Sequence, residues 1–189
     1  MAETALLIMD VQQHVVEHYA PDPESLLPAL ERAGAAARAA GVSVVYVRLG
    51  YREGLPEVSR RNRGFAVAAG SREFYDDSPS TAIHAAIAPQ PGDIVVTKKR
   101  VSAFTGSDLD VLLRSLGVTQ LVLGGIATSG VVLSTLRQAA DLDFGLTVLR
   151  DGCADPDDEV HRVLLDKVFP RQADVLEVDD WIASLRADA

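Results

Sequence analysis

The chain has 189 residues, of which 48% are hydrophobic and 24% charged, and its formal net charge is −9 at pH 7. This length fits one domain, residues 1–189, with a single substantial core, and the composition argues against disorder. The acidic balance argues against non-specific binding to nucleic acid or to an anionic membrane surface.

A single cysteine, Cys153, allows no disulfide within the chain and indicates a reducing compartment. The N-terminal stretch MAETALLIMDVQ has no basic region, and its apolar run is too short for a signal peptide. No apolar run reaches the length of a membrane span. We therefore expect a cytoplasmic protein without membrane contact.

The first half of the chain predicts two strands separated by a helix. The expected elements are a strand over 5–9 that ends at Asp10, a loop or short helical turn over 11–22, a helix over 23–40 and a strand over 42–49. Gly41 stops the helix, and Pro28 fits best in a first turn, so the regular part of the helix is expected to begin there.

Residues 50–80 form an irregular, charged segment, and a loop of that length in a compact domain usually has a function. After it we expect a short helix over 81–87, a strand over 93–97 with Lys98 at its carboxyl end, and a helix over 107–116 capped by Ser107 or Asp108. The neighbouring Lys99 and Arg100 are expected to be solvated.

The stretch 121–140 runs from a buried strand over 121–123 through the Gly-rich turn 124–130 into a helix. Backbone N–H groups at such a helix start suit an anion or an oxyanion. The rest of the chain predicts strands over 145–149 and 174–178 and helices over 157–168 and 179–185.

This alternation of strands and helices predicts a parallel sheet covered on both faces. Ligands of such sheets bind beyond the carboxyl ends of the strands, where the strand order reverses. Asp10, Lys98 and the 124–130 turn all lie at such ends, so we expect them to converge there.

Four motifs occur in order along nearly the whole chain: LLIMDVQ (6–12), VTKKRVSAF (96–104) followed by GSDLD (106–110), GGIATSGVV (124–132) and LRDGCADPD (149–157). Together they resemble the isochorismatase-like hydrolases, often called cysteine hydrolases. The resemblance implies a three-layer α/β/α fold with a six-stranded parallel sheet of Rossmann-like topology. It also implies a small-molecule substrate, a homodimer or larger homo-oligomer, and a triad of Asp, Lys and Cys.

By motif, the Asp and Lys of this triad are Asp10 and Lys98. The family also implies a cis peptide at Ile126–Ala127 and an oxyanion hole made by the N–H groups of Ala127 and Val131. Desolvation is expected to raise the pKa of Asp10, while Lys98 lowers it.

The family's nucleophilic Cys lies three residues after the Thr of the turn, where this chain has Val131. A valine cannot attack a carbonyl, so the usual thioester route is not available at that position. Thr128 and Gln12, together with Ala127, are the remaining candidates for binding substrate or an oxyanion.

Two other residues of the chain could supply a nucleophile. Cys153 is either a small buried filler or a relocated nucleophile, and it is expected two strand spacings, about 10 Å, from Asp10. That separation is too long for direct proton transfer. Ser129 lacks a base in its motif and, like Thr128, fits a helix cap.

His14 and His18 match H-x-x-E-H, a zinc-peptidase pattern when it lies on a helix. The match is only five residues long, and the 50–80 loop contains no His, so a His-rich metal centre is not expected. The intervals of the Gly-rich turn do not fit a dinucleotide fingerprint, so no cofactor is expected.

The sequence therefore favours a hydrolase in which Asp10 acts as general acid or base, Lys98 gives electrostatic support and water is the nucleophile. True isochorismatases, which also lack this Cys, hydrolyse a vinyl ether in that way. The Ala-Thr of the turn is not shared with them, so isochorismate is not claimed as the substrate. The alternatives are a non-catalytic small-ligand-binding protein of the same fold and, less favoured, a zinc hydrolase using His14 and His18.

Overall fold

The computed structural model describes residues 3–66 and 71–187; residues 1–2, 67–70 and 188–189 lie outside the described part. Six parallel strands form one sheet in the order β3-β2-β1-β4-β5-β6. The strands are β1 (Glu3–Met9), β2 (Ser43–Leu49), β3 (Ile94–Lys98), β4 (Val118–Ile126), β5 (Gly145–Ala154) and β6 (Asp174–Leu176). The strand order reverses between β1 and β4, the position at which ligands bind in sheets of this kind.

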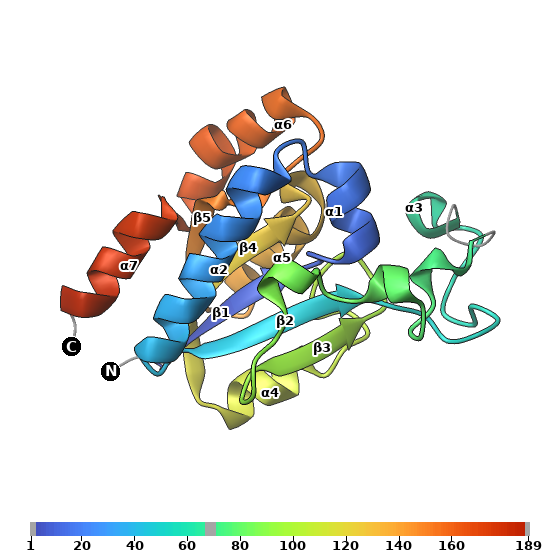
Figure 1. Ribbon diagram of the computed structural model, residues 1–189, viewed down its shortest axis with the longest axis horizontal. Coiled ribbons are helices and arrows are strands. Elements are labelled where there is room, and N and C mark those ends of the chain that lie inside the picture. Colours follow the sequence, from blue (N-terminus) through green and yellow to red (C-terminus); the bar gives the residue numbers. More distant parts are fainter. Residues whose placement is uncertain (1–2, 67–70, 188–189) are drawn as a thin grey trace.

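Helices cover both faces of this sheet, as predicted (Figure 1). The helices are α1 (Gln13–Tyr19), α2 (Pro23–Ala39), α3 (Arg63–Ala66), α4 (Leu109–Ser115), α5 (Leu133–Asp141), α6 (Asp158–Val163) and α7 (Val178–Ala187). Apolar side chains of α1, α2 and α7 share one core cluster, while α4, α5 and the turn that continues α6 share the other. Among residues 3–66 and 71–187, no helix is both long and apolar enough to cross a bilayer.

The apolar run of β1 explains why the sheet has two cores. Leu6 and Ile8 point to the layer of α2, and Leu7 and Met9 point to the layer of α5, because side chains alternate along a strand. All four side chains are at most 1% exposed. Truncating such a buried side chain to Ala typically costs about 2–5 kcal/mol, so β1 is held firmly under its carboxyl-end residue, Asp10.

Two expected elements were wrong. Helix α2 begins at Pro23 rather than at Pro28, because the Asp22 carboxylate accepts a hydrogen bond from Ser25 N–H (3.1 Å) and caps the helix there. Segment 81–87 is not an α-helix. It contains short 3₁₀ turns and an antiparallel bridge between Gln12 and Ile83, so part of its backbone bonds to the chain after β1.

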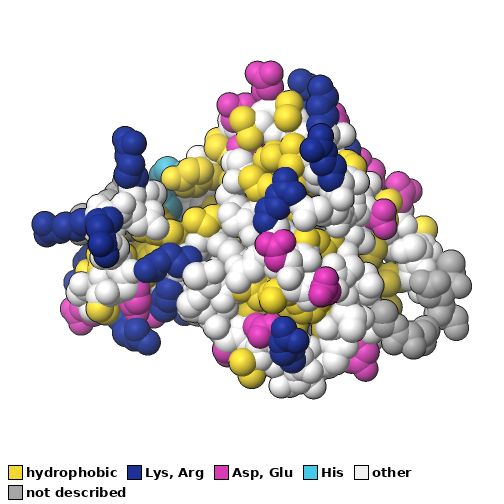
Figure 2. Space-filling model, turned by 180° about the vertical axis from the view of Figure 1, so that it is seen from behind, with side chains coloured by type: hydrophobic (Ala, Val, Ile, Leu, Met, Phe, Trp, Pro, Cys, Tyr) yellow, Lys and Arg dark blue, Asp and Glu magenta, His cyan; other side chains and the backbone are white. Residues whose placement is uncertain are grey.

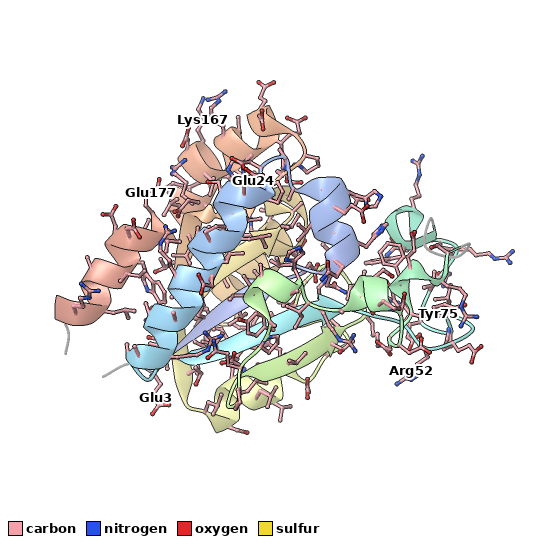
Figure 3. All side chains as sticks on the ribbon, viewed as in Figure 1. Glu3, Glu24, Arg52, Tyr75, Lys167 and Glu177 are labelled. Atoms are coloured by element: carbon pink, nitrogen blue, oxygen red, sulfur yellow. The ribbon has the colours of Figure 1, made fainter. Side chains whose placement is uncertain are left out.

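Part of the segment between β2 and β3 projects beyond the carboxyl ends of the strands as a lobe, residues 50–66 and 71–78 (Figure 1). Arg52 and Tyr75 lie on this lobe, far from Lys167 and Glu177 at the other end of the molecule (Figure 3). Tyr51 joins the lobe to the sheet, since its N–H donates to Phe74 O and its C=O accepts from Asp76 N–H, both at 2.8 Å. The lobe therefore begins directly over the strand ends that carry the candidate site.

Candidate active site

Asp10 ends β1 with a backbone conformation that aims its carboxylate. Its φ is +56°, in the left-handed region that non-Gly residues seldom adopt and that Asp tolerates better than most. Its N–H donates to Val47 O (2.8 Å), which fixes the turn out of the strand. The residue is only 9% exposed, and its Oδ1 atom is buried without a hydrogen-bond partner among the described residues.

Lys98 reaches Asp10 from β3, across the end of β2. Its Nζ atom lies 2.8 Å from Asp10 Oδ2 and also donates to Arg100 O (2.9 Å). The predicted proximity of the two side chains is confirmed. Burial raises the pKa of Asp10 above its ordinary value, although the charge and hydrogen bond of Lys98 lower it.

The Gly-rich turn continues β4, which runs three residues further than expected. The peptide bond Ile126–Ala127 is cis, as the family resemblance implied. A π-helical turn over Thr128–Val132 then leads into α5. Ala127 O accepts hydrogen bonds from the N–H groups of Gly130 (3.0 Å) and Val132 (3.3 Å), so the turn is closed from within.

Asp155 and His161, which sequence reasoning missed, hold this turn from β5 and α6. The Asp155 carboxylate, 4% exposed, accepts from Ser129 N–H (2.7 Å) and Asp157 N–H (3.2 Å). Thr128 Oγ1 contacts Ala154 O (3.1 Å) and the Nδ1 atom of His161 (2.8 Å). The signal for Asp155 was its place just after a strand in the fourth motif.

Both polar atoms of the Gln12 side-chain amide form hydrogen bonds with backbone groups. Its Nε2 donates to Leu49 O and Thr81 O, and its Oε1 accepts from Leu49 N–H, each at 2.8 Å. These bonds tie the chain after β1 to the end of β2. The geometry therefore favours a structural role for Gln12 over the predicted contact with substrate.

Cys153 pairs with Gly125 across β4 and β5, two strands from β1, as expected for this strand order. The residue is 6% exposed and packs in the core cluster on the α5 side of the sheet. Burial raises the pKa of its thiol to about 12, with a smaller opposing effect from a backbone hydrogen bond to Gly125. A thiol with that pKa is protonated at neutral pH, which favours the filler interpretation over a relocated nucleophile.

Lys99 and Arg100 are not simply solvated, contrary to expectation. Lys99 Nζ bonds Gly50 O (2.5 Å) and Asp76 Oδ2 (3.1 Å), which ties the lobe to the strand end. Arg100 is partly buried, donates to Lys99 O (2.6 Å), and places its guanidinium 5.8 Å from the centre of the Phe65 ring. Both residues therefore help to enclose the site.

The two histidines of the zinc alternative do lie on one helix, α1, with ring centroids 4.2 Å apart. His14 also approaches Glu73, with Nε2 3.7 Å from Oε2. Within the described ranges, no three His, Cys, Asp or Glu side chains gather closely enough to hold a metal ion. The three protein ligands of a catalytic zinc site are thus not assembled there.

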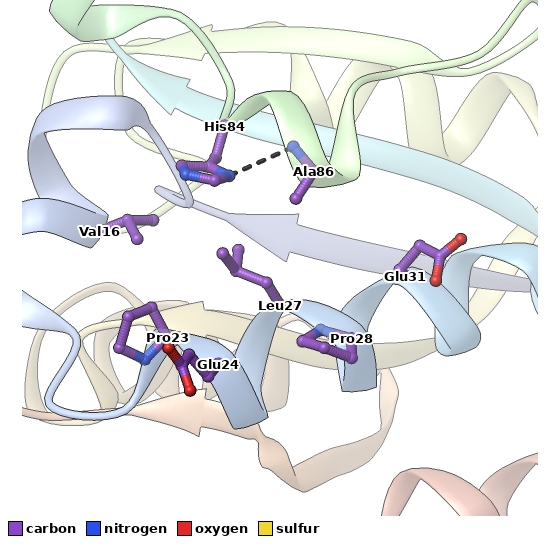
Figure 4. Close-up of a pocket in the computed structure, with 8 residues that line it drawn as sticks. All are labelled: Val16, Pro23, Glu24, Leu27, Pro28, Glu31, His84 and Ala86. Carbon is purple, nitrogen blue, oxygen red and sulfur yellow. Dashed lines mark hydrogen bonds between the residues drawn. The ribbon is translucent and has the colours of Figure 1, made fainter.

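An open groove of about 440 Å³ lies elsewhere, between α1, α2 and the chain near His84 (Figure 4). Another cavity of about 370 Å³ lies behind the turn and is lined by Asp155 and His161 among others. Neither is lined by Asp10 or Lys98. The candidate site is instead enclosed, with a buried acid, a buried amine and the N-terminal turn of α5 at the reversal of strand order.

Such an arrangement can transfer a proton from or to Asp10 and stabilise negative charge with Lys98. The access of water and of a reacting bond to Asp10 then depends on the lobe that covers the site. These are the components of general acid–base hydrolysis, and none of them is a covalent nucleophile.

Comparison with known proteins identifies similar sequences and structures. The isochorismatase domain model matches residues 4–180. The isochorismatase family protein YecD of Escherichia coli O157:H7 is 31% identical over 96% of each chain. Maleamate amidohydrolase of Pseudomonas putida is 29% identical over 96% of this chain and 86% of its own. The structure of an isochorismatase family protein from Burkholderia thailandensis superposes with a TM-score of 0.85 at 30% identity, covering 97% of this chain and 95% of that one.

Proposed function

The chain belongs to the isochorismatase family of hydrolases, and we propose that it hydrolyses a small molecule at Asp10 and Lys98 without a covalent thioester intermediate. The observation that carries this proposal is the buried ion pair, 2.8 Å between Lys98 Nζ and Asp10 Oδ2, with Asp10 Oδ1 left without a partner among the described residues. A second, unengaged oxygen on a buried acid is the atom that a reacting group or a water molecule can meet.

The absence of a cysteine from the turn supports the non-covalent route. Val131, 2% exposed, occupies the position of the family Cys, and its two methyl groups pack in the core cluster. The chain's single thiol, Cys153, is two strands away from Asp10 and protonated at neutral pH. A water molecule is therefore the nucleophile in the proposed reaction.

In this reaction the residues have separate roles. Asp10 exchanges a proton with the attacking water or the leaving group, and its raised pKa suits a general acid. Lys98 stabilises the carboxylate form and negative charge in the transition state. The N–H groups of Ala127 and Val131 would face a developing oxyanion. The likeness to maleamate amidohydrolase supports an amide as one substrate to test.

The rival proposal is a binding protein with the same pocket, and Val131 is the observation that favours it. Catalytic turnover of a substrate distinguishes the hydrolase from the binding protein. We also propose, from the family, a single domain over 1–189, a cytoplasmic location and a homo-oligomer that needs no cofactor.

The test is a panel of amides (maleamate among them), esters and enol ethers assayed with wild type, Asp10→Asn, Cys153→Ala and Val131→Cys. We expect Cys153→Ala to keep the wild-type rate and Asp10→Asn to lose at least about 10²-fold. Val131→Cys is expected to gain weak amidase or esterase activity by restoring a thiol at a helix start.

Circular dichroism shows whether each variant is folded. Strong wild-type amidase activity that is lost in Cys153→Ala would overturn the non-covalent mechanism. Binding of a panel compound without turnover by the wild type would establish the binding protein instead.

A further inference from the structure

Tyr51 presents a buried hydroxyl group beside the Asp10–Lys98 pair. It follows β2, and β2 lies between β1 and β3, whose ends carry Asp10 and Lys98. Tyr51 is 0% exposed, and its Oη atom has no hydrogen-bond partner among the described residues. Buried hydroxyl groups are normally satisfied, so an unengaged one at a strand-end site indicates a ligand contact.

The charges around Tyr51 belong to three residues: Arg100, Asp10 and Glu57. Burial raises the pKa of Tyr51 to about 12, Arg100 lowers it, and Asp10 and Glu57 raise it further. The phenol therefore stays protonated and can donate a hydrogen bond.

Arg100 and Tyr51 pack against the same aromatic ring, that of Phe65. The Tyr51 ring meets the edge of Phe65 at 6.2 Å between centroids, and Arg100 lies over the same Phe65 ring at 5.8 Å. One guanidinium N–H of Arg100 is used by Lys99 O. A guanidinium has five N–H donors, so the others can bind a ligand.

The balance of charge at this point is positive. Asp10 is paired with Lys98, and Glu57 with Arg52 at 2.5 Å. Within residues 3–66 and 71–187, Arg100 makes no ion pair with a carboxylate. Although the whole chain carries −9, dark blue Lys and Arg side chains gather over the lobe in Figure 2.

We propose that the Tyr51 hydroxyl and the Arg100 guanidinium hold a carboxylate of the substrate. The substrate is then a small carboxylic acid whose hydrolysable bond lies at Asp10, a few atoms from the carboxylate. A planar guanidinium fork with a neighbouring O–H donor matches a carboxylate and gives it a fixed orientation. This inference rests on the proposed function, because it takes Asp10 and Lys98 as the reacting centre.

The test uses two probes of equal length, succinamate, which has an amide and a carboxylate, and succinamide, its neutral diamide. Calorimetry measures their binding to wild type, Tyr51→Phe and Arg100→Gln. We expect succinamate to bind the wild type at least about tenfold more tightly than succinamide. Tyr51→Phe should weaken succinamate binding about tenfold, and Arg100→Gln roughly 10- to 100-fold with loss of the preference.

Two control variants separate recognition from structure. Arg61→Gln removes the same charge from an exposed position on the lobe and should leave the preference unchanged. Tyr46→Phe removes a buried hydroxyl that Arg38 contacts at 3.0 Å, so it should lower the melting temperature without affecting binding. Tyr51→Phe should not lower the melting temperature, because the hydroxyl it removes has no hydrogen-bond partner in the part of the chain that the structure describes.

Equal binding of the two probes by the wild type would overturn the proposal, and so would no binding of succinamate. It would also be overturned if Arg61→Gln matched Arg100→Gln. If the preference is found but neither probe nor any panel compound is hydrolysed, the carboxylate subsite stands and the proposed hydrolysis fails.

Discussion

Asp10 combines three features that are uncommon at an ordinary structural position. It is buried, it has a left-handed backbone conformation, and one of its oxygen atoms lacks a partner among the described residues. Among residues 3–66 and 71–187, Lys98 alone forms an ion pair with it. A buried ion pair with an unsatisfied atom is weak evidence for stability, because desolvation offsets the attraction between the two charges. The position of Asp10 at the reversal of strand order makes a chemical role the better explanation for these features.

The pH dependence of the reaction should follow this carboxyl group. Burial raises the pKa of Asp10 above 3.8, against the opposing effect of Lys98. If the protonated form donates a proton, activity is full below the raised pKa and falls as pH rises through it. Measuring kcat of the wild type from pH 4 to pH 9 should therefore show a descending limb. The same limb in Cys153→Ala would confirm that no thiol is involved, whereas activity that only rises with pH would contradict the general-acid role.

The turn that joins β4 to α5 depends on how closely β4 approaches β1. Gly125 has φ +143°, and a Cβ atom there would lie 2.0 Å from Met9 O. No side chain can occupy that space unless the two strands separate. The close approach sets the distance between Asp10 and the turn.

Gly125→Ala should therefore destabilise the protein by more than about 4 kcal/mol, or prevent folding, because backbone and not a flexible side chain would have to move. Gly130→Ala is the matched control. Its Cβ atom would meet nothing closer than Ala127 Cβ at 3.8 Å, so stability should change by about 1 kcal/mol or less. Urea unfolding of both variants measures the difference. Similar stability in the two would mean that β1 and β4 are not held this closely.

A second contact between elements ties α2 to the start of β3. Arg38 Nη2 lies 2.7 Å from Asp93 Oδ2, and its Nε donates to Oδ1 at 3.0 Å. Although burial raises the pKa of Asp93, the hydrogen bonds from Arg38 and from Gln90 N–H outweigh it, so the net shift is downward. The charged form is the one that the fold stabilises.

Asp93→Asn should cost about 2 kcal/mol at pH 7, since it removes hydrogen bonds between charged groups. A carboxyl with a lowered folded pKa contributes its stability above its unfolded value and loses it as pH falls through the folded value. The difference between wild type and Asp93→Asn should therefore shrink below pH 3.8. Urea unfolding at pH 7 and at pH 3 checks this, and an equal difference at both would contradict it.

Helices and strands could be predicted wherever the local spacing of apolar residues determines the secondary structure. The run before Asp10 identified a strand because it is buried on both faces. Segment 81–87 misled, because its helical spacing is overridden by backbone hydrogen bonds of Ala82 with Gln13 and of His84 with Val11, which are distant in sequence. Pro28 led to a wrong prediction of the helix start, because a helix that is capped earlier in the chain, here by Asp22, can continue through a proline.

At the scale of the whole molecule, the site was predictable to the extent that topology determines it. Carboxyl ends of parallel strands share one edge, so Asp10 and Lys98 could be brought together from the sequence. Tyr51 and Asp155 also follow strands, but their contacts could not be predicted in that way. These contacts depend on how the lobe and the loop after β5 fold back over the sheet, and no local pattern records that path.

The exposed edge of the sheet favours self-association. β3 is an edge strand, and edge strands present unpaired backbone groups to other chains. Val95 on this strand is 48% exposed on the α2 side of the sheet, because its neighbours Ile94 and Val96 face the other core, and Val111 on α4 is 66% exposed on the opposite side. A second copy of the chain that pairs with the edge of β3 would cover exposed apolar side chains on both sides of it. We therefore predict a homodimer that buries this edge.

Light scattering after size exclusion at micromolar concentration should give about twice the 20.2 kDa of one chain. Val111→Lys should shift the mass to that of the monomer, because a buried lysine at the centre of an interface leaves an unpaired charge. Val160→Lys is the control: Val160 is 37% exposed on α6, away from this edge, and its replacement should leave the dimer intact. A wild-type mass of 20.2 kDa would contradict self-association. A dimer that survives Val111→Lys but not Val160→Lys would place the interface on α6 instead of on the β3 edge.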